Sequence, residues 1–261
     1  MSGLLAIAGK EIRVYLTTPI SYALAASYVL LTAFFFERLL VQFQALALAY
    51  RERQQLADAL NLTDFVMTPL FFWMVTFLMF ILPLVTMRLF AEERRSRTLE
   101  LLLTTPVSAV EIVLGKYLGA LALMGAMIAL TGLFPLVLVA LGESSGGPIL
   151  DAATVLSGYT GVFLAGAAFI ALGMLTSTLT DSQLVAALLS LTLSVVFLVL
   201  GLAAPGLDGV VREVLNHVSL ATHVTDFARG IVRVSALVYY ATVIALGLFL
   251  CVRVLEGQRG R

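Results

Sequence analysis

The sequence of 261 residues has few charged side chains. They make up 12% of the chain, whereas 61% of the residues are hydrophobic. A soluble domain usually carries about 25% charged and about 45–50% apolar residues. So little charge cannot cover a water-facing surface at this length, which excludes a soluble enzyme, a nucleic-acid-binding domain and a disordered chain. The composition predicts an all-α, polytopic integral membrane protein that forms a single transmembrane domain over residues 1–261.

Other scarcities exclude further classes of protein. Cys251 is the one cysteine, so an internal disulfide and a cysteine metal cluster are excluded. Basic and acidic residues number 16 each, which leaves no polybasic arm for nucleic acid. The one Gly-Lys pair, Gly115-Lys116, lacks the upstream glycine of a phosphate-binding loop. We therefore expect no nucleic acid, metal or cofactor on this chain, no catalytic residue, and no ATP hydrolysis by the chain alone.

Hydropathy predicts about six membrane-spanning helices, since one span needs about 20 residues. The polar segment Gln42–Asp64 has helical spacing of apolar residues without Gly or Pro, so we expect a surface helix there. Thr68 is the expected N-cap of the second span, Pro83 and Pro135 should bend their helices, and residues 176–182 should form a tight polar turn. The expected spans are Ser21–Phe36, Pro69–Phe90, Ile112–Leu141, Ala153–Leu175, Leu184–Leu202 and Ala236–Val252.

Charge asymmetry predicts the orientation of this bundle. An even number of spans puts both termini and the connection between the second and third spans on one face. That face holds ten of the basic residues and the other face six. By the positive-inside rule both termini are expected in the cytoplasm, in the cell membrane of a prokaryote (its inner, cytoplasmic membrane). No cleaved signal peptide is expected, because the first hydrophobic run is too long.

The densest charge pattern lies between the second and third spans. Acidic and basic side chains at helical spacing, such as Glu93 with Arg97 and Glu92 with Arg95, favour a short helix that leaves the membrane. Pro106 should end it, and Ser108 with Glu111 forms a capping box that starts the next span. A solvated loop that only fixes topology is the alternative. The polar set is Glu92, Glu93, Arg94, Arg95, Arg97 and Glu100, and the apolar face is Leu99, Leu102 and Leu103.

Three other functional readings receive less support. His217, His223 and Asp226 could bind a metal on the outer face, but their spacing does not match a helical ligand pair, and interfacial polar residues explain them as well. An intramembrane hydrolase lacks a nucleophile motif. A secondary transporter is disfavoured because the predicted spans carry no ionisable residue near mid-membrane, where a coupling ion would need one.

A family resemblance spans nearly the whole chain. The run Phe90-Ala-Glu-Glu-Arg-Arg-Ser-Arg-Thr-Leu-Glu-Leu-Leu-Leu-Thr-Thr-Pro-Val-Ser, continued by Leu114-Gly-Lys-Tyr-Leu-Gly119, resembles permease subunits of type-2 ABC exporters, and within them the gliding-motility-associated branch. Four further pieces agree in order: Lys10-Glu-Ile-Arg13 up to Pro19, Ser177-Thr-Leu-Thr180 with Gln183, Phe227-Ala-Arg-Gly230 and Val252-Arg-Val-Leu-Glu256. Arg97 stands where that family more often has glycine, so a flexible joint and an uninterrupted charged helix both stay open.

The resemblance implies the type-2 exporter permease fold and a division of the chain into named parts. Residues 1–19 would form an interfacial elbow helix with Lys10, Glu11 and Arg13. Residues 91–107 would form a cytoplasmic coupling helix, and residues 205–233 an outer re-entrant hairpin. A separate ABC ATPase, carrying ATP and Mg²⁺, would drive the permease. A second copy or a homologous permease would complete the pathway, with an accessory periplasmic subunit as a further partner.

We therefore expect a permease subunit of an ATP-driven transporter, most simply an exporter. The alternatives are a non-transporting membrane subunit, which passes ATPase motion to a periplasmic or motility assembly or anchors it, and then a secondary transporter. The sequence does not name the transported substrate, because mostly apolar spans suit lipids, peptides and glycans alike.

Overall fold

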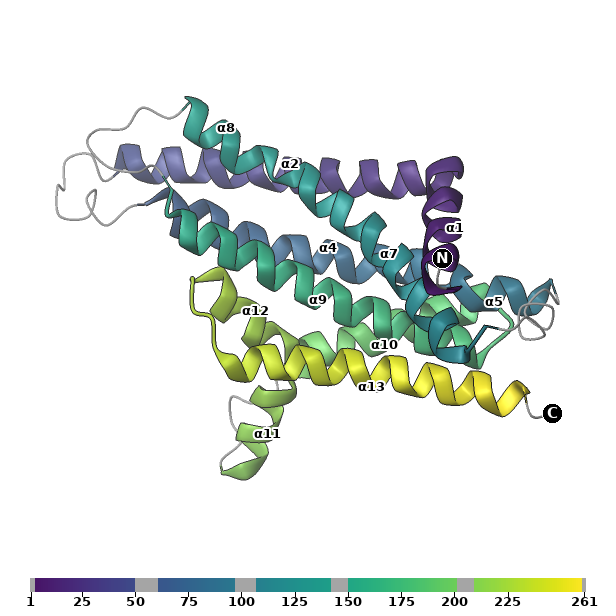
Figure 1. Cartoon of the computed structure of the whole chain (residues 1–261). Coiled ribbons are helices and arrows are strands. Elements are labelled where there is room, and N and C mark those ends of the chain that lie inside the picture. Colours follow the sequence, from purple (N-terminus) through teal and green to yellow (C-terminus); the bar gives the residue numbers. More distant parts are fainter. Residues whose placement is uncertain (1–2, 50–60, 97–106, 142–149, 201–208, 260–261) are drawn as a thin grey trace.

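Helices account for every regular element in the part of the chain that the computed structural model describes, residues 3–49, 61–96, 107–141, 150–200 and 209–259. The long helices lie side by side in a bundle, and α1 runs across one end of it (Figure 1). In chain order the elements are α1 (Gly3–Thr17), α2 (Pro19–Ala49), the π-helical turn η1 (Thr63–Met67), α4 (Thr68–Thr86), α5 (Arg88–Arg95), α7 (Ala109–Thr131), α8 (Leu133–Leu141), α9 (Ala152–Leu179), α10 (Gln183–Val199), α11 (Val210–Val218), α12 (Leu220–Ala228) and α13 (Val234–Arg259).

The bundle has two ends of different character. Both termini, α1 and α5 lie at one end, which we call the charged end (Figure 1). The short helices α11 and α12 lie toward the other, which we call the hairpin end. This arrangement is the one that an even number of crossings produces.

Five helical segments in the described ranges are long and apolar enough to cross a membrane, and the α10 segment is a shorter apolar helix of 17 residues. A span needs about 17–25 residues, so α10 reaches the lower limit. The all-α membrane fold predicted from composition is confirmed. The five long segments are Pro19–Ala49, Thr63–Arg95, Ala109–Ala140, Ala152–Leu179 and Val234–Gln258.

The first span is longer than predicted, and the surface helix expected over Gln42–Asp64 is wrong for its first residues. Residues 42–49 continue α2 without a break. Glu37 and Arg38 directly follow the predicted end of the span at Phe36, but neither residue type breaks a helix. The two side chains pair at 3.5 Å, and the Arg38 guanidinium lies 5.2 Å from the centre of the Phe34 ring. Residues 50–60 of the expected helix are outside the described residues.

Thr68 is not the N-cap of the second span. The chain is already helical there, and the Thr68 hydroxyl donates to the Ala228 carbonyl instead, at 3.0 Å. The Asn61 side chain accepts from the backbone N–H of Asp64 at 2.6 Å, as an N-capping side chain does. Helical structure therefore begins before Thr68, and Pro69 occupies the first turn of α4 as expected.

Both predicted proline bends fall near a break between two helices. The α4 helix contains Pro83 and ends at Thr86. Pro135 lies three residues beyond the break at Gly132, which separates α7 from α8. A proline cannot donate to the carbonyl four residues earlier, here that of Thr131. The Tyr159 hydroxyl supplies the missing donor, at 2.8 Å.

The α9 helix is the central one, with buried residues along nearly its whole length. Glycines let its neighbours approach closely. A Cβ at Gly161 would lie 2.5 Å from Cβ of Phe227 on α12, and a Cβ at Gly173 would lie 2.2 Å from the Thr86 hydroxyl on α4. Lipid provides no hydrophobic driving force between helices, so close packing at small residues contributes to helix association instead. Packing on α9 thus orders the rest of the bundle.

The polar turn predicted over residues 176–182 is shorter than expected. Thr176, Ser177 and Thr178 belong to the last turn of α9, and only residues 180–182 leave the helix. The Thr176 and Thr178 hydroxyls donate to carbonyls of their own helix, those of Gly173 and Leu175. Hydroxyl side chains that bond back in this way are tolerated in a helix, so their polarity did not mark its end.

Candidate functional site

The charged end begins with α1, which packs against α7. Gly115 and Gly119 provide the contact surface: a Cβ would lie 2.8 Å from Cβ of Ile7 at the first position and 2.6 Å from Cβ of Glu11 at the second. The two glycines are four residues apart, hence on one face of α7. This close approach brings the polar side chains of α1 against the start of α7.

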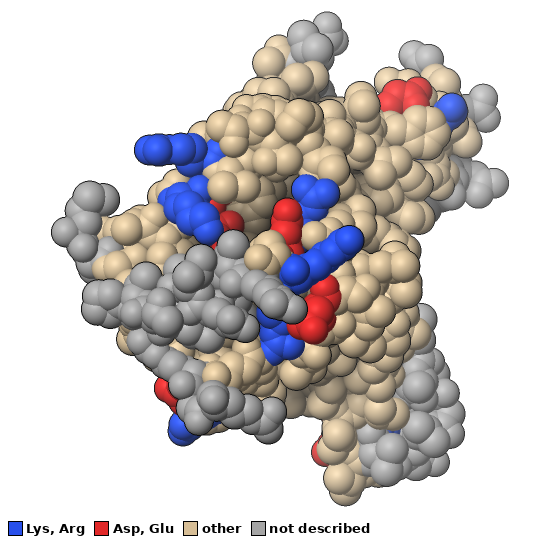
Figure 2. Space-filling view, turned by 90° about the vertical axis from the view of Figure 1, so that its right-hand side faces the viewer, with Lys and Arg blue, Asp and Glu red and all other residues tan. Residues whose placement is uncertain are grey.

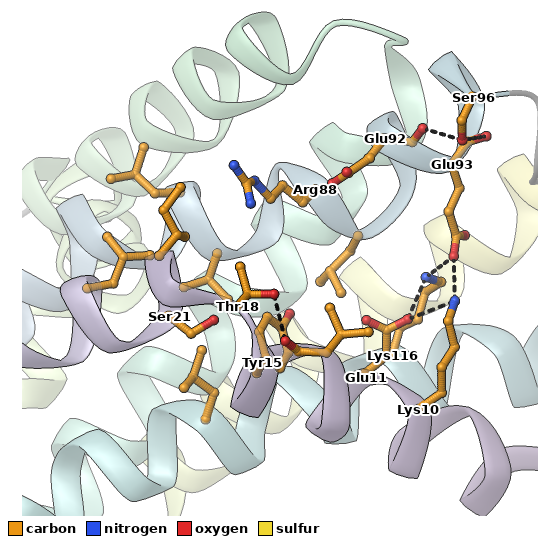
Figure 3. Close-up of a pocket in the computed structure, with 17 residues that line it drawn as sticks. Lys10, Glu11, Tyr15, Thr18, Ser21, Arg88, Glu92, Glu93, Ser96 and Lys116 are labelled. Carbon is orange, nitrogen blue, oxygen red and sulfur yellow. Dashed lines mark hydrogen bonds and ion pairs between the residues drawn. The ribbon is translucent and has the colours of Figure 1, made fainter.

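Four charged side chains from three helices meet at that contact (Figure 3). The Lys116 ammonium on α7 donates to Glu11 of α1 at 2.9 Å and to Glu93 of α5 at 2.8 Å. Lys10 of α1 reaches the same Glu93 oxygen at 3.1 Å. The Lys116 side chain is 2% exposed, so this charge is held entirely by protein groups. We call these residues, Lys10, Glu11, Glu93 and Lys116, the charge cluster.

The charge cluster favours the ionised form of Lys10. Burial by itself lowers the pKa of Lys10, but the charges and hydrogen bonds of Glu93 and Glu11 outweigh it and raise the pKa above its ordinary value of 10.5. A buried ion pair gives little net stability because both ions lose water, yet removing one partner is costly. The cluster therefore acts mainly as a connection between α1, α5 and α7.

The α5 helix is fastened to α9 as well. The Ser177 hydroxyl on α9 accepts from the backbone N–H groups of Phe90 and Ala91, at 3.2 and 3.1 Å, and donates to the Met87 carbonyl. The first turn of any helix leaves N–H groups without a partner in the helix itself, and here another helix supplies the acceptor. Arg94 adds an ion pair with Asp181 at 3.3 Å.

These contacts show where the predicted coupling residues lie. Glu92 and Arg95 are exposed on α5, whereas Glu93 and Arg94 are engaged within the chain, with Lys10, Lys116 and Asp181. Residues 97–106 of the coupling helix expected over 91–107 lie outside the described residues, and the part up to Ser96 continues the second span as α5. The remaining predicted coupling residues, Leu99, Glu100, Leu102, Leu103 and Arg97, and the predicted stop at Pro106 lie outside the described residues.

Other predicted residues of this end are placed by short-range contacts. Ser108 and Glu111 form the predicted capping box: the Ser108 hydroxyl accepts from the Glu111 N–H at 3.2 Å, and the Glu111 carboxylate accepts from the Ser108 N–H at 3.0 Å. Lys10, Glu11 and Arg13 all lie on α1, with Glu11 buried and Arg13 exposed. The predicted elbow is thus a described helix at the charged end.

Sequence reasoning missed Lys116, Ser177 and Asp181 as members of this site. Lys116 carried a usable signal, because a single lysine within an apolar helical run needs a buried partner. Nothing local identified that partner, since Glu11 is 105 residues away.

At the hairpin end, His217 and His223 lie close to each other. His223 Nε2 donates to the His217 carbonyl at 3.0 Å, and the two rings lie 5.8 Å apart. Asp226 pairs with Arg233 at 3.2 Å. Among the described residues, no three His, Cys, Asp or Glu side chains come together as metal ligands.

Comparison with known protein families finds a match over residues 5–227 to the model described as "ABC-2 family transporter protein". No curated protein matches the chain. The matched range begins within α1, ends within α12 and includes the charge cluster and α5.

Proposed function

The chain belongs to the ABC-2 family of transporter proteins and is a permease component of an ABC transporter; from this premise we propose that it is the permease subunit of an exporter driven by a separate ATPase. In this proposal the charged end faces the cytoplasm with both termini, in the cytoplasmic membrane of a prokaryote. The ATPase carries ATP and Mg²⁺ and contacts the exposed side of α5. Within the family, we assign the chain to the gliding-motility-associated branch on the basis of the sequence resemblance.

The observation that supports this mechanism is the set of connections made by α5. This short helix extends the second span, binds α1 and α7 through Glu93, and is held on α9 by Ser177. A displacement of α5 therefore reaches four other elements of the bundle through direct contacts. Figure 2 views the charged end and shows basic and acidic side chains gathered near its centre. Such a surface suits a soluble protein partner with complementary charge.

A second permease, either another copy or a homologue, is proposed to complete the pathway. Large apolar side chains are exposed along α2 and α10, for example Leu30 and Leu184. Lipid and a second helical bundle can both cover such surfaces. A non-transporting subunit that passes ATPase motion to a periplasmic or motility assembly would use the same α5 connections, so the two functions differ only in whether a substrate crosses.

Crosslinking tests the docking proposal directly. In a Cys251→Ser background, Arg95→Cys places a probe on exposed α5, and the matched control Arg212→Cys places one on exposed α11. With the proposed ABC ATPase partner, we expect a crosslink from residue 95 and none from residue 212. Equal crosslinking from both positions, or ATP hydrolysis by the purified permease above a contaminant control, would contradict the proposal.

Charge reversal then tests coupling. Glu92→Lys with Arg95→Glu changes the exposed polar side chains of α5 and leaves the charge cluster intact. A single surface ion pair contributes about 0–1 kcal/mol, so the double variant is the fairer test. We expect it to insert normally and to lose several-fold of the permease-stimulated ATPase rate. Unchanged stimulation would mean that α5 only fixes topology.

A further inference from the structure

A cavity of about 620 Å³ lies beside the charge cluster, between the α1–α2 corner, the end of α4, and α5. Its volume is within the range of about 300–1,000 Å³ found for sites that hold small molecules. The described residues Lys10, Glu11, Glu93 and Lys116 form one side of it, and these charges satisfy one another. The cavity therefore has a polar wall without net charge.

Two further charges line the cavity and remain without a partner there. Arg88 and Glu92 project from α5 into the cavity, away from Lys10 and Glu93 (Figure 3). They lie four residues apart, yet no ion pair joins them, and Arg88 has no acidic partner among the described residues. The Nε atom of Arg88 is buried and has no hydrogen-bond acceptor. A buried guanidinium donor without an acceptor is costly, which indicates that a ligand supplies one.

The cavity wall also holds the hydroxyls of Tyr15, Thr18, Ser21 and Ser96, and apolar side chains line the part that extends toward the interior of the bundle. Leu24 on α2, Leu84 and Val85 on α4, and Leu123 on α7 line it. Leu123 lies seven residues beyond Lys116, which is about 10 Å further along the helix. The cavity thus passes from a charged region at the bundle end to an apolar region deeper in the membrane-spanning part. A molecule that fills the cavity must therefore be amphiphilic, with its polar group at the charged end and its apolar part toward the interior of the bundle.

We propose that this cavity binds one phospholipid, with the lipid phosphate on Arg88 and a headgroup amine near Glu92. Arginine donates in a planar fork that matches the oxygens of a phosphate. A headgroup that carries both a phosphate and an ammonium, such as phosphoethanolamine, also satisfies the carboxylate of Glu92. The acyl chains then lie along the leucines of α2, α4 and α7. The site goes beyond the proposed transport function, because binding requires neither ATPase nor turnover.

Native mass spectrometry of the purified permease tests the proposal, with lipids added one at a time. We expect one phosphatidylethanolamine to stay bound at concentrations where phosphatidylglycerol binds more weakly. Arg88→Gln should weaken phosphatidylethanolamine binding about tenfold, the size of a lost charge-assisted hydrogen bond. Arg253→Gln is the matched control, since Arg253 is an exposed arginine on α13, and the C-terminal end of this helix lies at the charged end (Figure 1). This control should bind lipid as the parent does.

Two further variants test the apolar wall of the cavity and the role of Glu92 separately. Val85→Phe fills the apolar wall without changing charge, and it should exclude the lipid as well. Glu92→Gln should remove the preference for phosphatidylethanolamine over phosphatidylglycerol. The lipid site would be overturned if Arg88→Gln and Val85→Phe both bind lipid like the parent, or if millimolar inorganic phosphate displaces it, which would mean a simple anion site. Lipid binding in a chain that fails to crosslink to the ATPase would reject the transport proposal and leave this one standing.

Discussion

The two ends of the bundle are held together by different chemistry. At the charged end, ionised side chains from three separate helices meet around Lys116, and the most buried of them is 2% exposed. At the hairpin end, neutral groups bond to backbone carbonyls: Tyr239 to Val218 at 2.6 Å and Thr68 to Ala228 at 3.0 Å. The ion pair of Arg233 with Asp226 is largely exposed on the arginine side.

This difference suits different tasks. When one partner of a buried ion pair is removed, the remaining charge stays buried without a partner, which costs stability. The charged end therefore behaves as one connected unit. Neutral hydrogen bonds to carbonyls contribute less each and act independently of one another. A partner that displaces α5 would therefore affect α1 and α7 together, whereas a change at the hairpin end would stay local.

The largest expected effect comes from removing Lys116. Lys116→Met leaves Glu11 and Glu93 buried without their shared cation, which should cost about 3–5 kcal/mol of stability. Lys10→Met is the matched control, because the Lys10 side chain is 56% exposed and bonds the same carboxylate. We expect it to cost about 0–1 kcal/mol. The fraction of protein that stays monodisperse after heating in detergent measures both variants.

A second substitution sharpens this test. Adding Glu11→Gln to Lys116→Met removes one of the unpaired carboxylates and should recover part of the lost stability. If Lys116→Met is as stable as Lys10→Met, the charge cluster is not the connection between these helices, and the contrast between the two ends fails.

A smaller effect is expected at the hairpin end, where two adjacent tyrosines form a matched pair. The Tyr239 hydroxyl donates to the Val218 carbonyl, whereas the buried Tyr240 hydroxyl has no partner. Tyr239→Phe should cost about 0.5–1.5 kcal/mol. Tyr240→Phe should be neutral or stabilising, because it removes an unsatisfied polar group. The same thermal assay compares the two variants, and an equal loss in both would mean that the hydrogen bond does not hold α11 to α13.

The smallest expected effect is a difference in pH response. Burial lowers the pKa of His223 below its ordinary value of 6.5, although its bond to the His217 carbonyl acts in the opposite direction. The unfolded chain then binds the proton more readily, so the stability contributed by neutral His223 is present above pH 6.5 and falls as the pH drops. The raised pKa of Lys10 has the opposite consequence: its contribution is present below pH 10.5 and is lost as the pH rises through the folded value.

The pH response can be assigned by substitution. His223→Gln should flatten the acid side of the stability profile, and Lys10→Gln the alkaline side. The groups that face His223 are His217, Asp226, Arg233, Tyr239 and Tyr240. His217→Gln is therefore the control, and it should keep the acid loss. If the loss of stability in acid persists in His223→Gln but disappears in His217→Gln, then His217 and not His223 causes it, and this prediction is wrong.

Local patterns predicted much of the helical structure. The capping box of Ser108 and Glu111 joins residues three apart, and the proline near each helix break acts on a carbonyl four residues back. Among the described residues, hydropathy located the five long apolar helices and the shorter apolar helix α10, but it misjudged helix ends. Glu37 and the hydroxyls of residues 176–178 are polar, yet each is compatible with a continuing helix.

The sequence by itself determined the membrane class, the order of the helices and the capping box of Ser108 and Glu111, because these depend on composition and on neighbours within one turn. Only the tertiary structure decided which charges meet. Lys116 finds Glu11 at a separation of 105 residues and Glu93 at 23. Those pairs depend on how α1 and α5 are positioned against α7, which Gly115, Gly119 and Ser177 set through close contacts. Ion pairing needs atoms within about 4 Å, and no rule of spacing along the chain specifies that distance between separate helices.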